Sequence, residues 1–136
     1  MIEPAVRAQI LSSTGVTALI GSGNTGRAYD KRLPEGATLP AVTYQQISRD
    51  GFPDYDGVTQ LARTRVQVDC WHTNGQGAAD LAQVVRHVLD GFKGTVASTK
   101  ILASFLLDEE SGFEVETGLH RYRQDFQISY HDVIST

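Results

Sequence analysis

The feature of this sequence that most constrains its fold is a two-residue alternation that runs from Ala62 to His72. Every second position holds a small or apolar side chain: Ala62, Thr64, Val66, Val68 and Cys70. The positions between them hold charged or amide side chains: Arg63, Arg65, Gln67 and Asp69. Because successive side chains of a strand point to opposite faces of a sheet, this pattern predicts a strand with one buried and one polar face.

An amphipathic helix is predicted directly after this strand. Asn74 suits the N-cap position, because its side chain can accept a hydrogen bond from a backbone N–H of the first turn. Apolar residues then recur at intervals of three and four: Ala78, Leu81, Ala82, Val85, Val88, Leu89 and Phe92. This spacing places them on one helix face, and Gly91 is expected to end the helix.

Two further helical segments are predicted near the N-terminus. The first covers Glu3–Ser13, where Pro4 suits the first turn and apolar residues recur every four positions. The second is a short helical turn over residues 16–20. From Asp30 to Pro40, prolines and a glycine exclude a regular helix, so this segment is expected to cross the surface in an extended form.

Three more strands are predicted within Ala41–Ser48, Val96–Leu107 and Phe113–Tyr130. Their separators, Arg49–Gly57 and Asp108–Gly112, are rich in Gly, Pro and acidic residues and are expected to be loops. One face of the middle strand would hold Ala97, Thr99, Ile101, Ala103, Phe105 and Leu107. One face of the last strand would hold Tyr122, Phe126, Ile128 and Tyr130, and the other face Arg121, Arg123, Asp125 and Gln127.

The predicted order of main elements is α-β-β-α-β-β. Two strand pairs that each follow a helix favour an α+β fold with a mainly antiparallel sheet. Both helices would pack on the apolar face of the sheet and leave the opposite face polar. The length of 136 residues suits a single domain over residues 1–136.

Charge and composition exclude several classes of protein. The net charge is -4, and the 12 Lys and Arg residues are dispersed, which argues against electrostatic or specific nucleic-acid binding. The single cysteine, Cys70, cannot form an internal disulfide, so folding in a reducing cytoplasm is expected. No signal peptide is visible and no apolar run approaches the roughly 20 residues that span a bilayer, so a soluble protein without membrane contacts is expected.

No catalytic, cofactor or metal site is predicted. The run Gly21–Gly26 matches G-x-G-x-x-G, but the residues after it do not favour the helix that would bind a phosphate, so it is interpreted as a surface loop. A small cytoplasmic enzyme that binds a nucleotide there remains an alternative. Cys70 and His72 stand about 7 Å apart on one strand face, too far for a nucleophile–base hydrogen bond, and no second cysteine completes a metal site.

Two surfaces are candidates for contacts with partners. The polar sheet face could be a subunit interface, where charges of both signs fix register and orientation. Its candidate residues are Arg63, Arg65, Gln67, Asp69, Arg121, Arg123 and Asp125. The loop over Arg49–Gly57 could contact a partner or line a lumen. Its candidate residues are Arg49, Asp50, Phe52, Asp54, Tyr55 and Asp56.

Several short motifs, taken in order, resemble the phage tail-completion family, which includes tail terminator and tail-to-head joining proteins of long-tailed phages and gene-transfer particles. The motifs extend over most of the chain, roughly from Val6 to Tyr130. They are Leu39–Tyr44 with Ser48, Arg65–Trp71, Leu81–Ala82, Val85–Phe92 and Gly118–Phe126. The Gly21–Gly26 run is not part of the resemblance.

The resemblance implies a structural virion protein and not an enzyme. Such a protein would form a ring, commonly a hexamer, that ends the tail tube at its head-proximal end and joins the tail to the head. Its partners would be further copies of itself, the tail tube protein and a head-completion or neck protein, with DNA passing through the lumen. A head-side neck protein is a closely related alternative.

Overall fold

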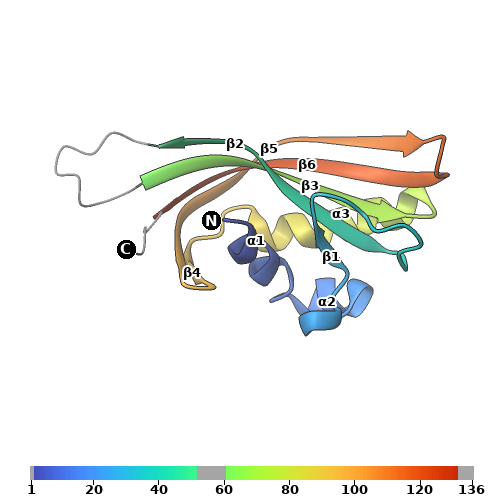
Figure 1. Ribbon diagram of the computed structural model, residues 1–136, viewed down its shortest axis with the longest axis horizontal. Helices are drawn as coiled ribbons and strands as arrows, with labels where there is room; N and C mark the ends of the chain where they lie inside the picture. The colour runs from blue at the N-terminus through green and yellow to red at the C-terminus, as the bar shows by residue number, and fades with distance from the viewer. Residues whose placement is uncertain (1, 52–60, 132–136) are drawn as a thin grey trace.

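The computed structural model describes residues 2–51 and 61–131, which form one sheet with helices on one of its faces (Figure 1). The helices are α1 (Glu3–Ile10), α2 (Thr14–Ile20) and α3 (Gly75–Leu89), with a 3-10 turn, η1, at Gly23–Thr25. The strands are β1 (Ala28–Asp30), β2 (Ala41–Gly51), β3 (Leu61–His72), β4 (Gly94–Val96), β5 (Thr99–Glu114) and β6 (Leu119–His131). Their order across the sheet is β1-β2-β3-β6-β5-β4.

All strand pairs are antiparallel except β1 with β2. The centre of the sheet is the ladder of β3 with β6, which runs without a register shift from the Leu61–His131 pair to the His72–His120 pair. An unbroken ladder keeps the same side chains on the same face along its whole length. The apolar face of β3 therefore continues directly into the apolar face of β6.

The hydrophobic core lies between this apolar face and the helices. Helix α3 buries Leu81, Ala82, Val85 and Leu89, and the facing strands bury Val66, Val68, Phe126, Ile128 and Tyr130. One amide lies among these apolar residues. The side chain of Gln124 is fully buried and donates a hydrogen bond to the backbone oxygen of Ala82 at 2.9 Å. This bond partly compensates for the burial of the amide and ties β6 to α3.

The α+β class, the mainly antiparallel sheet and the packing of the helices on one face are confirmed (Figure 1). The alternation in β3 buries Ala62, Thr64, Val66, Val68 and Cys70, as the pattern predicts. Helix α3 is capped by Asn74, whose side-chain oxygen accepts the N–H of Gly77 at 2.6 Å. Helix α1 is shorter than predicted, because Ser13 caps a separate helix α2.

Two short edge strands were not predicted. β1 follows η1 and pairs in parallel with Val42–Tyr44 of β2. β4 forms a hairpin with the start of β5 through Ala97 and Ser98, whose φ angles are 48° and 63°. Positive φ at both central residues gives a turn whose twist suits a hairpin. The prediction of one strand over Val96–Leu107 was wrong, because Ala97 and Ser98 form a turn at positive φ, which neither residue type usually adopts.

The face assigned to the middle of β5 was also wrong. A register shift between Ile101 and Ala103 inserts one extra residue and moves the side chains that follow to the opposite face, until a second shift between Leu106 and Asp108 restores the original alternation. Phe105 and Leu107 are consequently 55% and 49% exposed, whereas Ser104 is buried in their place. The predicted Asp108–Gly112 loop is also strand, since β5 stays paired with β6 as far as Glu114.

The first three residues of the predicted loop over Arg49–Gly57 are strand, which contradicts that part of the prediction. Arg49, Asp50 and Gly51 belong to β2, where Asp50 pairs with Arg63 and Gly51 with Ala62. A register shift between Gln46 and Ser48 lets the strand continue through this polar stretch. The other candidate loop residues, which are Phe52, Asp54, Tyr55 and Asp56, lie outside the described residues.

The cap of α3 provides a test of this packing. Asn74→Ala removes the acceptor for the Gly77 N–H and should lower the free energy of unfolding by about 1 kcal/mol. Asn74→Asp keeps the acceptor and should stay close to the wild-type value. Urea denaturation would measure both variants, and equal midpoints for the alanine variant and the wild type would contradict the role of the cap.

Candidate functional site

The glycine run does not form a phosphate-binding turn. Helix α2 ends before it, η1 lies within it, and β1 follows, so no helix N-terminus points at the glycines. The guanidinium of Arg7 instead donates to the backbone oxygens of Gly23 at 3.2 Å and Gly26 at 3.1 Å. These hydrogen bonds from Arg7 to two carbonyl oxygens of the loop hold the loop against α1.

Cys70 lies in the core and not in a reactive setting. Its side chain is fully buried, and this burial raises the pKa of the thiol well above its usual range. A thiol that stays protonated is a poor nucleophile and a poor metal ligand. Across residues 2–51 and 61–131, no three His, Cys, Asp or Glu side chains lie close enough together to hold a metal ion. In the same ranges, no helix is long and apolar enough to cross a membrane.

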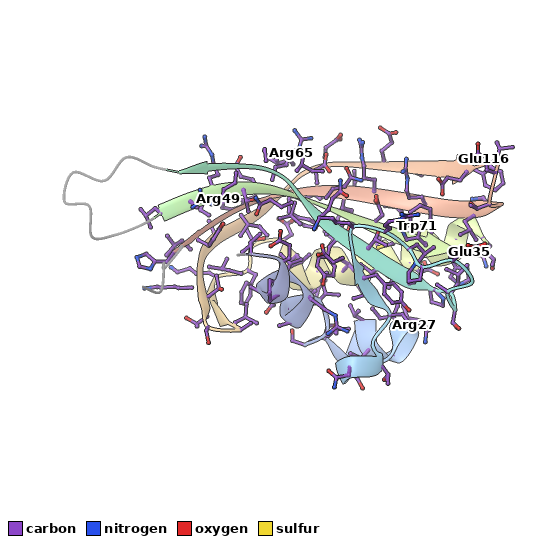
Figure 2. All side chains as sticks on the ribbon, in the orientation of Figure 1. Arg27, Glu35, Arg49, Arg65, Trp71 and Glu116 are labelled. Atoms are coloured by element: carbon purple, nitrogen blue, oxygen red, sulfur yellow. The ribbon has the colours of Figure 1, made fainter. Side chains whose placement is uncertain are left out.

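The sheet face away from the helices brings the predicted interface residues together (Figures 1 and 2). Strands β3 and β6 are neighbours, and their register places Gln67 opposite Asp125 and Asp69 opposite Arg123. Arg65 stands opposite Gln127 and projects from this face in Figure 2. The polar residues that alternate along two separate segments of sequence therefore lie side by side on one sheet face.

Ion pairs cross this open face. The guanidinium of Arg65 contacts the Asp125 carboxylate at 2.6 Å, and Arg123 lies 3.3 Å from Glu110 and 3.6 Å from Asp108. Asp108 and Asp125 are direct cross-strand partners, which would repel each other without these cations. Each arginine of this set thus pairs with a carboxylate on a neighbouring strand, so positive and negative groups lie next to each other across β3, β6 and β5.

Two apolar side chains that were predicted to share a strand face with Ile101 lie beside these ion pairs. Phe105 pairs with Gln127, which in turn pairs with Arg65, so all three share the open face. Leu107 lines a hollow of about 310 Å³ together with Arg65 and Gln127. We call Arg65, Phe105, Leu107, Asp125 and Gln127 the open-face patch. No sequence signal marks the register shift that turns Phe105 outward.

The other end of the open face is partly covered. Residues 31–39, here called the strap, join β1 to β2 and form one wall of a groove of about 850 Å³. Its other walls include Gln67, Asp69, Trp71 and Arg121. Figure 2 shows Trp71 and Glu35 toward this end of the sheet. The strap contains no regular helix, as predicted, but it bends at Lys31 and turns at Gly36 and so is not extended. It lies beside Asp69 and Trp71, which are each only 8% exposed on a face predicted to be open.

Asp69 is the most unusual group in this groove. Its Oδ2 accepts a hydrogen bond from Gln67 at 2.9 Å, whereas its buried Oδ1 has no partner among the described residues. Burial raises the pKa of Asp69, and the Gln67 hydrogen bond and the charges of Arg121 and Arg123 offset part of this effect. A buried carboxylate with an unpaired oxygen costs stability.

This cost predicts that Asp69→Asn stabilises the chain at pH 7, by up to about 1 kcal/mol, because an amide avoids burial of a charge. The folded-state pKa of Asp69 is raised, so its ionised form is disfavoured in the folded protein at neutral pH. The wild type recovers this stability as pH falls through that pKa, and the difference between the two proteins should shrink. Urea denaturation from pH 7 to pH 4 would check this; a variant less stable at pH 7 would contradict it.

Both the sequence and the fold of this chain are similar to those of known proteins. The family model for "Tail completion protein gp17" matches residues 4–131 of the chain. No curated protein matches the sequence. Among solved structures, a chain of the "Virion of native gene transfer agent (GTA) particle" has the same fold, with a TM-score of 0.69 at 16% identity. That match covers 94% of this chain and 92% of the other.

Proposed function

This chain belongs to the family of tail completion protein gp17, and on that basis we propose that it forms a ring that ends the tail tube and joins the tail to the head. Its role as a structural virion component of a phage tail follows from the family itself. The proposal goes beyond the family in three respects: the ring itself, its six subunits, and its contacts with the tail tube protein and a neck protein.

The observation that carries the ring proposal is the open-face patch. A sheet face without covering helices exposes Phe105 and Leu107 beside the Arg65–Asp125 ion pair. Subunit interfaces combine apolar contact area with charges whose arrangement selects one register and one orientation. The patch offers both on one surface, and the further charges of Arg63 and Arg123 extend it along β3 and β6.

A ring also needs a second, different surface on each subunit, because its contacts are head-to-tail. The edge of β2 is a suitable one. β1 pairs only with Val42–Tyr44, so residues 45–51 of β2 have no strand partner on that side within the described part of the chain. On the far edge of the sheet, the segment after α3 contacts the middle of β5, because the Gly91 N–H donates to the Ser104 oxygen at 2.6 Å.

The ring proposal predicts that Phe105→Asp combined with Leu107→Asp weakens assembly at least about tenfold while the subunit stays folded, because both side chains are exposed and both changes remove apolar contacts of the open-face patch. Light scattering over a concentration series, alone and with tail tube protein, would measure the mass. Leu19→Asp is the matched control, since Leu19 is 40% exposed on α2, on the helix side of the sheet. Two results would contradict the proposal: a wild-type protein that stays monomeric even with tail tube protein, or a double variant that assembles as well as the wild type.

We also propose that the end of β2, with Arg49 and Asp50, and the residues after it, with Phe52, Asp54, Tyr55 and Asp56, meet the tube, the lumen or the neck. Replacing Phe52 and Tyr55 with Ser should leave ring mass unchanged and reduce tail-to-head joining several-fold, because aromatic side chains commonly anchor protein contacts. Counting joined particles by electron microscopy would check this. Normal joining would exclude the two aromatics from the contact.

Deletion of the gene would distinguish a protein that ends the tail from a head-side neck protein. A protein that ends the tail should leave over-long or unattached tails when it is missing. A head-side neck protein should instead leave filled heads that lose their DNA. The first outcome supports the proposal, and the second assigns the chain to the head side.

A further inference from the structure

Within the described part of the chain, each edge of the sheet contains a stretch of strand without a neighbouring strand. On one edge, β1 pairs only with Val42–Tyr44, which leaves residues 45–51 of β2 open. On the other edge, β4 pairs only with Thr99–Ile101 of β5, and the segment after α3 contacts Ser104 and Leu106. Residues 107–114 of β5 are open beyond these contacts. The backbone groups of such edges can pair with another strand.

The two open stretches are similar in length and run in opposite directions. β2 is antiparallel to β3, β3 to β6, and β6 to β5, so β2 and β5 are antiparallel to each other. Figure 1 shows the end of β2 and the β5–β6 hairpin at opposite ends of the molecule. In a ring, one rotation relates each copy to the next, so strands keep their direction along the ring axis. A β5 edge beside the β2 edge of the next copy is therefore antiparallel to it, which is the more stable pairing.

The ends of the open stretches set the register of such a pairing. β1 occupies the β2 edge as far as Tyr44, and β5 ends at Glu114. The longest pairing that avoids β1 therefore places Glu114 of one copy opposite Gln45 of the next. β2 carries one extra residue at its register shift, so the same pairing brings Gly112 opposite Ser48.

The side chains at these two positions belong to the same face of the sheet, as a paired register requires. Ser48 lines the hollow that contains Arg65, and Gly112 stands opposite Arg121, which lines the groove beside the strap. Both the hollow and the groove lie on the open face. Leu107 of the open-face patch begins the open stretch of β5, so the pairing adjoins the surface on which the ring proposal rests.

The stagger of this register agrees with a sheet that closes on itself. Ser48 and Phe105 lie in one row across the sheet, through their successive partners on β3 and β6. The pairing moves this row along β5 from Phe105 to Gly112, by roughly 20 Å when the extra residue at the second register shift of β5 is discounted. The four long strands β2, β3, β6 and β5 span about 19 Å across the sheet. The two lengths correspond to a strand tilt of roughly 45°, at the upper end of the range for closed sheets.

We propose that residues 45–51 of β2 pair with residues 109–114 of β5 in the next copy as antiparallel strands, so that one sheet continues from subunit to subunit. This deepens the proposed function, on which it rests for the presence of neighbouring copies. It names the partner of the β2 edge, and it assigns the open stretches of both edges to one contact between copies of this chain.

A disulfide between copies tests the pairing. Opposite residues of antiparallel strands have Cα atoms about 4.5–5.5 Å apart, which is within disulfide range. In one copy, β3 and β6 separate Ser48 from Gly112 by roughly 14 Å or more, which excludes a disulfide within the chain. A Cβ at Gly112 would meet no atom beyond its chain neighbours nearer than 4.0 Å. Cys70 is fully buried and does not compete.

The double variant Ser48→Cys with Gly112→Cys should give a ladder of cross-linked chains up to the size of the ring after oxidation with diamide. An equimolar mixture of the two single variants should stop at cross-linked dimers, because each chain then carries only one of the two cysteines. The matched control is Ser48→Cys with Ser111→Cys. Ser111 pairs with Tyr122, which packs against the core, so the second cysteine faces the helices and should not cross-link.

Light scattering under reducing conditions separates this pairing from the ring itself. A ring of wild-type mass that gives no cross-links, or that cross-links equally well in the control variant, overturns the pairing and leaves the ring standing. A protein that stays monomeric even with tail tube protein contradicts the ring and the pairing together.

Discussion

The pairing of β3 with β6 is the constraint on which the rest of the structure depends. The ladder has no register shift over its whole length, so one face of both strands stays apolar and the other stays polar. The apolar face needs cover, and α3 supplies it through Leu81, Val85 and Leu89. The polar face needs none, because its charges pair with each other, as Arg65 does with Asp125. One pairing thus creates both the core and the surface available for assembly.

The open face is not uniform, and its two ends suit different contacts. At one end, Phe105 and Leu107 add apolar area to a set of ion pairs, a combination suited to a stable contact between subunits. At the other end, the strap covers Asp69 and Trp71 and leaves a groove with a buried, partly unpaired carboxylate. Under the proposed function, a divided face allows one contact with further copies of the chain and a separate contact with other virion proteins.

Departures from regular pairing decide which side chains reach this surface. The shift between Ile101 and Ala103 turns Phe105 outward and buries Ser104, whose hydroxyl oxygen has no partner among the described residues. A buried, unpaired hydroxyl costs stability, whereas an exposed Phe adds area for a contact. β5 therefore departs from the simplest core pattern at the place where the open-face patch forms.

The sequence by itself determined the elements whose pattern is local. The alternation along β3, the amphipathic spacing of α3 and the cap at Asn74 all follow from side-chain periods that neighbouring residues set. The α+β class follows from their order. Only the tertiary structure decided the rest: the shifts in β2 and β5, the hairpin at Ala97 and Ser98, and the strap over Asp69. The two shifts and the strap depend on contacts with strands distant in sequence, and the energy of such contacts outweighs local preference. The hairpin is local, but it requires positive φ at two residues that rarely adopt it.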